Sequence, residues 1–102
     1  MSQLPTYPLS LIRQLIWEGR YRLTGSATLH ASALGFTRTE VVDCIINLRA
    51  RDFYKTMGSH RFPTLMQDVY RPRFEGHDLY VKLQIQSQPS GQLVMIISFK
   101  DL

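Results

Sequence analysis

The amino-acid sequence predicts an α+β fold, in which about three helices from the first half of the chain pack against an antiparallel sheet of about four main strands from the second half. Two observations lead to this prediction. Apolar residues recur at helical spacing before Ala50 and alternate with polar residues after Arg51. Short turns separate the expected strands, and consecutive strands joined in this way pair antiparallel. One face of such a sheet must be buried, and the helices are available to cover it.

Helix start and stop signals divide the first half of the chain. We expect helices over about residues 8–18, over 26–34, and from 37 to Arg49 or Ala50. Gly19 and Gly35 follow the first two helices, where a left-handed residue commonly ends a helix. Thr37 and Glu40 have the spacing of a capping box, which marks the start of the third helix. Between the first two helices, Tyr21–Leu23 is a candidate for a short extended segment.

Alternation of apolar and polar residues predicts the strands. We expect them over about residues 53–57, 64–73, 79–86 and 93–100. Pro72 cannot donate a ladder hydrogen bond, so it confines the second strand to an edge or marks its end. Residues 75–78 and 87–92 carry turn signals. The last strand should turn one set of side chains to one face of the sheet and a second set to the other: Leu93, Met95, Ile97 and Phe99 against Val94, Ile96, Ser98 and Lys100.

Composition limits the class of function. The 102 residues have the length of one domain, 1–102, and 44% apolar with 20% charged residues is ordinary for a globular protein. The net charge is +4, and a basic balance permits binding to nucleic acid or to an acidic protein. The sequence has neither a signal-peptide pattern nor an apolar stretch long enough for a bilayer, so we expect a cytoplasmic protein that contacts no membrane. The single cysteine, Cys44, lies in an apolar stretch and is expected to be a buried residue.

Strand register can be inferred from the turn between the last two strands. If this turn centres on Ser90, Tyr80 lies opposite Lys100 and Lys82 lies opposite Ser98. All four residues then share the polar face, because opposed residues point to the same side of an antiparallel sheet. A phenol and an ammonium group placed in this way can contact the same ligand.

The preceding hairpin extends this polar face. If Gly76 and His77 form a two-residue loop, Arg73 pairs with Tyr80 and Arg71 pairs with Lys82. The resulting cluster contains cations and no carboxylate: Gln67, Arg71, Arg73, Tyr80, Lys82 and Lys100. An ordinary solvated sheet face remains the alternative, although such faces usually mix charges of both signs.

Four segments of the second half resemble the MqsR family, the toxins of bacterial type II toxin–antitoxin systems. They are Asp52-Phe53-Tyr54-Lys55-Thr56-Met57, Gln67-Asp68-Val69-Tyr70-Arg71-Pro72-Arg73, Tyr80-Val81-Lys82-Leu83 and Ser98-Phe99-Lys100. The resemblance extends over most of the chain and implies a RelE-like fold that cleaves mRNA without the ribosome. It implies Lys55, Gln67, Tyr80 and Lys100 as catalytic residues. It also implies a cognate antitoxin as partner, commonly a DNA-binding protein with its own zinc site.

The chain departs from the family pattern at three places. Met66 stands where the family commonly has Trp, the loop from Gly58 to Pro63 differs, and the turn from Ser87 to Gln92 is longer than usual. We expect the first two differences to affect the preferred RNA sequence.

RNA can be cut without a metal or other cofactor when its 2′-hydroxyl attacks the adjacent phosphorus, which requires a base, an acid and cations on the phosphate oxygens. The sequence contains no pair of histidines well placed for acid–base catalysis and no cluster with the spacing of a metal site. We expect His30, His60 and His77 at surface or loop positions. The remaining candidates are Tyr80 and the lysines, whose pKa values we expect neighbouring cations to lower.

The expected roles follow from this chemistry. Lys55 and Lys100 stabilise the phosphorane, Tyr80 moves a proton and Gln67 orients the nucleotide. The assignment of base and acid stays open. Arg71, Arg73 and Lys82 are expected to bind the RNA backbone.

Two other functions use the same basic face. One is a non-catalytic RNA-binding module, which would present exposed aromatic side chains such as Tyr54 for base stacking. The other is a protein-interaction subunit that docks an acidic partner. Defined RNA cuts would separate the nuclease from the first, and salt-sensitive RNA binding would argue against the second.

Overall fold

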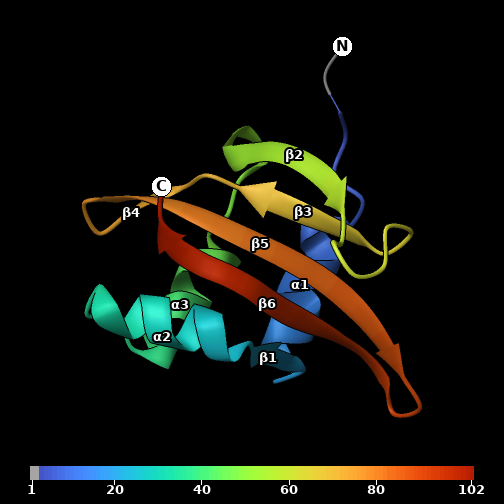
Figure 1. The fold of residues 1–102 in the computed structure, drawn as a ribbon. Coiled ribbons are helices and arrows are strands. Elements are labelled where there is room, and N and C mark those ends of the chain that lie inside the picture. Colours follow the sequence, from blue (N-terminus) through green and yellow to red (C-terminus); the bar gives the residue numbers. More distant parts are fainter. Residues whose placement is uncertain (1–2) are drawn as a thin grey trace.

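The computed structural model describes residues 3–102 (Figure 1). Its helices are α1 (Leu9–Trp17), α2 (Gly25–Ala33) and α3 (Arg38–Ile46), followed by one 3₁₀ turn at Ala50–Asp52. Its strands are β1 (Tyr21–Leu23), β2 (Phe53–Gly58), β3 (Met66–Tyr70), β4 (Arg73–Phe74), β5 (His77–Gln88) and β6 (Gly91–Asp101). No helix in this described part is long and apolar enough to cross a membrane.

The sheet has the strand order β1-β6-β5-β3-β2, and β4 pairs only with β5. Strands β2, β3, β5 and β6 form the expected antiparallel meander. Strand β1, which corresponds to the short extended segment expected at Tyr21–Leu23, adds to β6 in parallel. Two short strands, β1 and β4, therefore raise the number above the four expected, and the predicted α+β class is confirmed.

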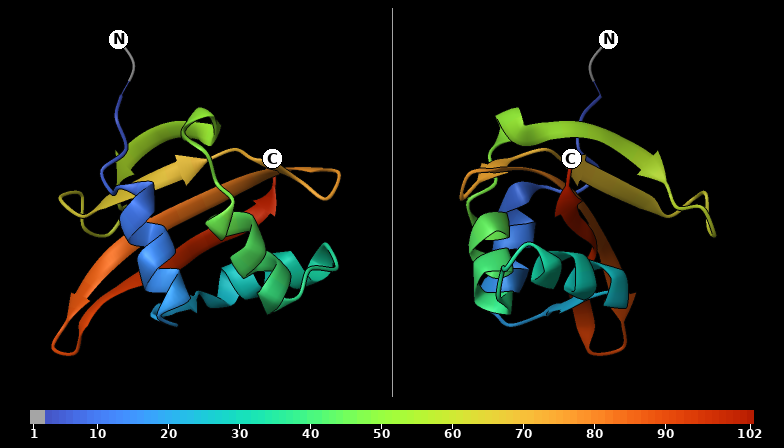
Figure 2. Two further views of the ribbon diagram at one scale, coloured as in Figure 1. Left: turned by 180° about the vertical axis from the view of Figure 1, so that it is seen from behind. Right: turned by 60° about the vertical axis from the view of Figure 1, so that its left-hand side comes forward.

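The helices cover one face of this sheet and leave the other open. In Figure 1, α1 and α3 lie behind β5 and β6, and the reverse view in Figure 2 shows them in front. Strand β5 turns its apolar side chains into the core below the helices, namely Leu79, Val81, Leu83 and Ile85. The intervening side chains from Tyr80 to Gln86 therefore face away from the helices, as the alternation predicted.

The start of α3 follows the prediction and its end does not. The Thr37 hydroxyl accepts from the Glu40 backbone N–H, and a Glu40 carboxylate oxygen accepts from the Thr37 N–H, which completes the capping box. The helix ends at Ile46, before the Arg49 or Ala50 expected. The Asn47 side chain donates to the Asp43 carbonyl and so satisfies one of the carbonyls at the end of the helix. The chain then leaves the helical path, and Leu48 enters the core.

Pro72 ends β3 earlier than expected. The predicted strand over residues 64–73 is shortened to β3, and the chain pairs again with β5 only at β4. The Arg71 N–H, which precedes the proline, donates to the Asp52 carbonyl. The loss of a donor at Pro72 thus separates one predicted strand into two.

A β-bulge in β6 changes which of its side chains face the helices. Lys82 pairs with Ser98 and Leu83 pairs with Ile96, so Ile97 is an extra residue without a partner in β5. Val94, Ile96 and Phe99 all lie in the core as a result. The expectation that Leu93, Met95, Ile97 and Phe99 share one face is wrong, because regular alternation does not pass through a bulge. The Thr24 hydroxyl, which also caps α2, donates to the Ile97 carbonyl and ties the helix to the bulge.

Candidate active site

The open face of the sheet consists of the side chains of the meander that point away from the helices. From the pairing and the core contacts, its members are Lys55, Met57, Gln67, Val69, Tyr80, Lys82, Gln84, Gln86, Leu93, Met95, Ser98 and Lys100. All three lysines of the chain belong to it. None of the members is acidic, which separates this face from an ordinary solvated surface with mixed charges.

The centre of the open face confirms the predicted register. Tyr80 pairs with Lys100 and Lys82 pairs with Ser98. The ammonium groups of both lysines lie near the Tyr80 ring, with Nζ of Lys100 5.3 Å and Nζ of Lys82 5.8 Å from its centre. One phenol therefore lies between two cations, in reach of the same bound group.

The predicted pair Tyr80–Lys100 is correct, but the position of the turn does not by itself produce it. The loop has two residues, Pro89 and Ser90, so its centre lies between them and not on Ser90. On that basis alone Tyr80 would face Phe99. The extra residue at Ile97 shifts the register by one position and restores the pair Tyr80–Lys100.

Lys55 reaches the open face through a second bulge, in β2. Phe53 pairs with Tyr70 and Lys55 pairs with Val69, so Tyr54 is the extra residue. Phe53 consequently packs edge-on against Tyr70 on the helix side, while Lys55 lies on the open side in line with Val69, which pairs with Lys82. In a regular strand residues 53 and 55 would share a face, and Lys55 would point to the core side.

The bulged residue, Tyr54, is half exposed and flanked by cations. Cζ of Arg71 lies 4.6 Å from the centre of the Tyr54 ring, and Nζ of Lys55 lies 5.5 Å from it. An exposed aromatic ring with two cations beside it is suited to stacking a nucleobase while a cation contacts its phosphate.

Gln67 lies on the same face but is buried, with 7% of its surface exposed. Its Nε2 donates to Oε1 of Gln84 on the neighbouring strand at 2.9 Å. Gln84 is 3% exposed. Gln84 was not among the residues predicted from the sequence, although its even spacing from Tyr80 and Lys82 on one strand places it on their face.

The hairpin between β4 and β5 corrects the predicted position of the two arginines. Its loop is Glu75–Gly76, both with positive φ, and not Gly76–His77. Arg73 consequently pairs with Asp78 and not with Tyr80, and the pair Arg71–Lys82 is also wrong because Val69 occupies the position opposite Lys82. Arg71 remains close to the open face through Tyr54.

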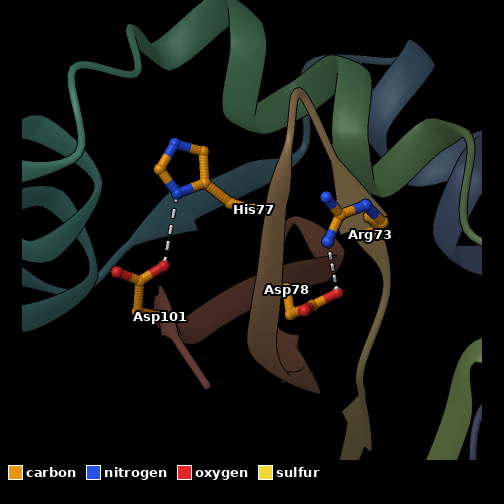
Figure 3. A network of polar contacts seen from close by, with 4 residues as sticks. All are labelled: Arg73, His77, Asp78 and Asp101. Carbon is orange, nitrogen blue, oxygen red and sulfur yellow. Dashed lines mark hydrogen bonds and ion pairs between the residues drawn. The ribbon is translucent and has the colours of Figure 1, made fainter.

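Figure 3 shows two polar contacts made by residues of this hairpin. Nη1 of Arg73 lies 3.0 Å from Oδ1 of Asp78, at the exposed edge of the molecule. Nδ1 of His77 lies 3.4 Å from Oδ1 of Asp101, and the His77 ring also packs against Phe36. Both contacts hold the hairpin, and neither brings a predicted site residue to Tyr80.

The pKa values of Lys82 and Tyr80, the two central groups of the open face, are shifted in opposite directions. Burial lowers the pKa of Lys82, and the nearby charges of Lys100 and Lys55 lower it further. Burial raises the pKa of Tyr80, and the nearby Tyr54 adds to this effect. The expectation that neighbouring cations lower the pKa of a lysine thus agrees with Lys82, whereas for Tyr80 burial prevails and the pKa moves in the opposite direction.

Other chemistry-bearing residues lie elsewhere. Cys44 is 2% exposed, and burial raises the pKa of its thiol to about 12. His30 is exposed on α2, within 3.5 Å of the Ser26 hydroxyl. Within residues 3–102, no three side chains of the types His, Cys, Asp and Glu gather into a possible metal site.

A small α+β protein that presents three lysines and a tyrosine on an open sheet face without carboxylates has a surface suited to binding a polyanion. The chain belongs to the family described as motility quorum-sensing regulator, toxin of MqsA, which matches residues 4–101. It is 37% identical over 100 residues to the mRNA interferase toxin MqsR of Escherichia coli (strain K12). The match covers 98% of this chain and 97% of that protein. These comparisons confirm the resemblance found in the sequence.

Proposed function

We propose that this protein is an mRNA interferase, an endoribonuclease toxin that cuts RNA on the open face without the ribosome. The observation that carries the proposal is the placement of Tyr80 between Lys82 and Lys100, with Lys55 on the same carboxylate-free face. Membership of the toxin family and the name of the curated relative support it. An mRNA substrate places the proposed reaction in the cytoplasm.

The proposed reaction needs no metal ion. The 2′-oxygen of one nucleotide attacks the neighbouring phosphorus, a bond forms between them, and the bond from phosphorus to the 5′-oxygen of the next nucleotide breaks. Lys55 and Lys100 stabilise the additional negative charge on the phosphorane. The products are a 2′,3′-cyclic phosphate and a free 5′-hydroxyl.

Two proton transfers accompany this exchange of bonds. Lys82, whose pKa is lowered, accepts the proton of the 2′-hydroxyl in its neutral form. Tyr80, whose pKa is raised, stays protonated and gives its proton to the departing 5′-oxygen. We thus extend the expected role of Lys82 from binding the RNA backbone to acting as the base, and assign the acid role to Tyr80.

The remaining residues position the RNA. Arg71 and Tyr54 offer a stacked pair for one nucleotide. Gln67, held by Gln84, orients the nucleotide at the cut through its other amide atoms. Arg73 lies at the rim and contributes little net charge, since its guanidinium is already paired with Asp78.

A toxin of this kind requires neutralisation, so we propose a cognate antitoxin as a second partner. The family description, toxin of MqsA, supports a protein antitoxin. We further propose that this antitoxin binds DNA and contains zinc, as the family resemblance implies.

The test is to incubate the purified protein with mixed single-stranded RNA in EDTA and to determine the chemistry of the new ends. The proposal expects defined cuts that carry 2′,3′-cyclic phosphates. Ends that carry only 5′-phosphates, or activity that disappears on chelation, would contradict the metal-free reaction. Intact RNA under all conditions, together with salt-sensitive binding, would instead favour a non-catalytic RNA-binding module.

A further inference from the structure

A cavity of about 340 Å³ lies between the end of α3 and the segment that joins β3 to β4. Ten residues line it, and the charged ones among them are Arg49, Arg51, Asp52, Arg71, Arg73 and Asp78. Four of these ten residues are arginines and two are aspartates. The volume lies within the usual range for small-molecule sites and is large enough for a nucleotide unit.

The charges in this cavity do not cancel. Arg73 is paired with Asp78. Oδ2 of Asp52 accepts from the backbone N–H of Arg49 at 2.8 Å. Within the described residues, Arg49, Arg51 and Arg71 make no ion pair. Three arginines that line the cavity therefore have no carboxylate partner there, in a chain that folds other arginines onto backbone carbonyls, as Arg13 and Arg20 show.

Arg71 connects this cavity to the proposed active site. Arg71 lines the cavity, and its Cζ lies 4.6 Å from the centre of the Tyr54 ring, which in turn lies beside Lys55. One strand of RNA that passes over Tyr54 can thus continue directly into the cavity. Guanidinium groups suit this role because their planar fork matches the oxygens of a phosphate.

We propose that this cavity is a phosphate-binding subsite that holds the RNA backbone at least one nucleotide away from the cut. The inference rests on the proposed RNA substrate and adds Arg49 and Arg51 to the residues that bind it. An acidic protein segment would meet the same charges. RNA is favoured because Arg71, which lines the cavity, also lies against Tyr54 beside Lys55 of the open face, so that a single polyanion can contact both.

The test compares two double variants with the same change in net charge. Arg49→Gln/Arg51→Gln removes the two cavity cations that the proposed active site does not use. Arg22→Gln/Arg38→Gln removes two exposed cations that lie in β1 and at the start of α3, away from the cavity. Binding is measured by fluorescence anisotropy with 2′-O-methyl RNA, which lacks the attacking hydroxyl, in one short and one longer form and at several salt concentrations.

The subsite predicts a loss confined to the longer RNA. The slope of log K against log salt should decrease in magnitude by about 1.4 for the cavity variant, because each lost phosphate contact with a single strand contributes about 0.7. Binding of the short RNA, which does not reach the subsite, should stay at the wild-type level. The control variant should retain most of the wild-type slope, and the melting temperature should confirm that both variants fold.

Three results would overturn the inference. The first is a slope equal to that of the control variant, and the second is an equal loss on short and long RNA. The third is weaker binding of the antitoxin while the RNA slope stays unchanged, which would assign the cavity to a protein partner. A wild-type protein that neither binds nor cuts RNA would instead contradict the proposed function itself.

Discussion

Gln67 and Gln84 form a buried pair of side-chain amides across β3 and β5, with Nε2 of Gln67 2.9 Å from Oε1 of Gln84. This hydrogen bond fixes the orientation of Gln67, a residue of the proposed active site that is shielded from water. Loss of one partner from a buried hydrogen bond costs about 1–3 kcal/mol, because the other group stays unpaired.

Substitution of this pair should separate stability from activity. Gln84→Leu is expected to lower the free energy of unfolding by about 1–3 kcal/mol and to reduce cleavage, because the Gln67 amide loses its acceptor. The double variant Gln67→Leu/Gln84→Leu should regain most of the stability, since no polar group is then orphaned, while cleavage stays low. Urea unfolding and a cleavage assay measure the two effects. Full activity in the double variant would show that the pair is only structural.

Tyr80→Phe tests the proposed acid. Removal of the hydroxyl should lower kcat by about 10²–10⁴-fold, the usual contribution of a positioned proton donor, and leave RNA affinity and the melting temperature nearly unchanged. Tyr54→Phe is the matched control, since its ring remains available for stacking beside Arg71. If Tyr80→Phe cuts RNA at the wild-type rate, Tyr80 is an ordinary residue of the sheet.

Lys82→Arg tests the proposed base through pH. In the wild type the neutral amine is the active form, so kcat should rise with pH by about tenfold per unit below the lowered pKa of Lys82. The rise should level off above the pKa of Lys82, and kcat should fall only above pH 10, where Tyr80 deprotonates, because its pKa is raised from 10.0. Arginine keeps the charge but does not deprotonate, so the variant should bind RNA normally and lose the rise. An unchanged profile would exclude Lys82 as the base.

Tyr70 offers a test of stability alone. Its hydroxyl is buried and has no hydrogen-bond partner among the described residues, and burial raises its pKa to about 12. Tyr70→Phe should raise the free energy of unfolding by about 1 kcal/mol and the melting temperature by about 4–8 °C. Tyr7→Phe should have the opposite sign, because the Tyr7 hydroxyl donates to the Met66 carbonyl at 2.7 Å. Destabilisation by both substitutions would contradict the unpaired state of Tyr70.

Cys44 should react only after unfolding. Its thiol is buried and its pKa is raised to about 12, so little thiolate forms at any pH well below that value. Iodoacetamide at neutral pH should label the protein in denaturant and leave the native protein unmodified, as mass spectrometry will show. Rapid labelling of the native protein would mean that the core around α3 opens readily.

Periodic features of the fold could be predicted from the sequence. Alternation from Leu79 to Gln86 and the capping box at Thr37 depend on neighbours close in the chain, and both appear as expected. The placement of Tyr80 beside Lys100 was also predicted, although it depends on two departures from the assumed hairpin that compensate for one another.

The two bulges could not be predicted, because contacts between distant segments hold them. The extra residue Ile97 is bound through its carbonyl by Thr24, which is 73 positions away. The bulge at Tyr54 lets Phe53 reach Tyr70 in the core. No local pattern in either strand marks these positions, so the placement of Lys55 rested on the family resemblance alone.

The error in the β4–β5 loop, by contrast, could have been avoided. Both Glu75–Gly76 and Gly76–His77 contain the same glycine. Only the first puts it at the second loop position, where tight hairpin turns with two positive φ angles most often have glycine. The correct loop separates Arg73 from Tyr80 and pairs it with Asp78.

The bulge at Ile97 also makes the site depend on whether the number of residues in the β5–β6 hairpin is even or odd. A relative that shortens the hairpin tip by paired residues retains the contact between the tyrosine and the distal lysine. A relative that loses a single residue retains this contact only if the lost residue is the bulged one, at the position of Ile97. Gaps in an alignment of this segment should therefore be placed at the bulge when their length is odd, and the lysine near the C-terminus will otherwise be assigned to the wrong face of the sheet.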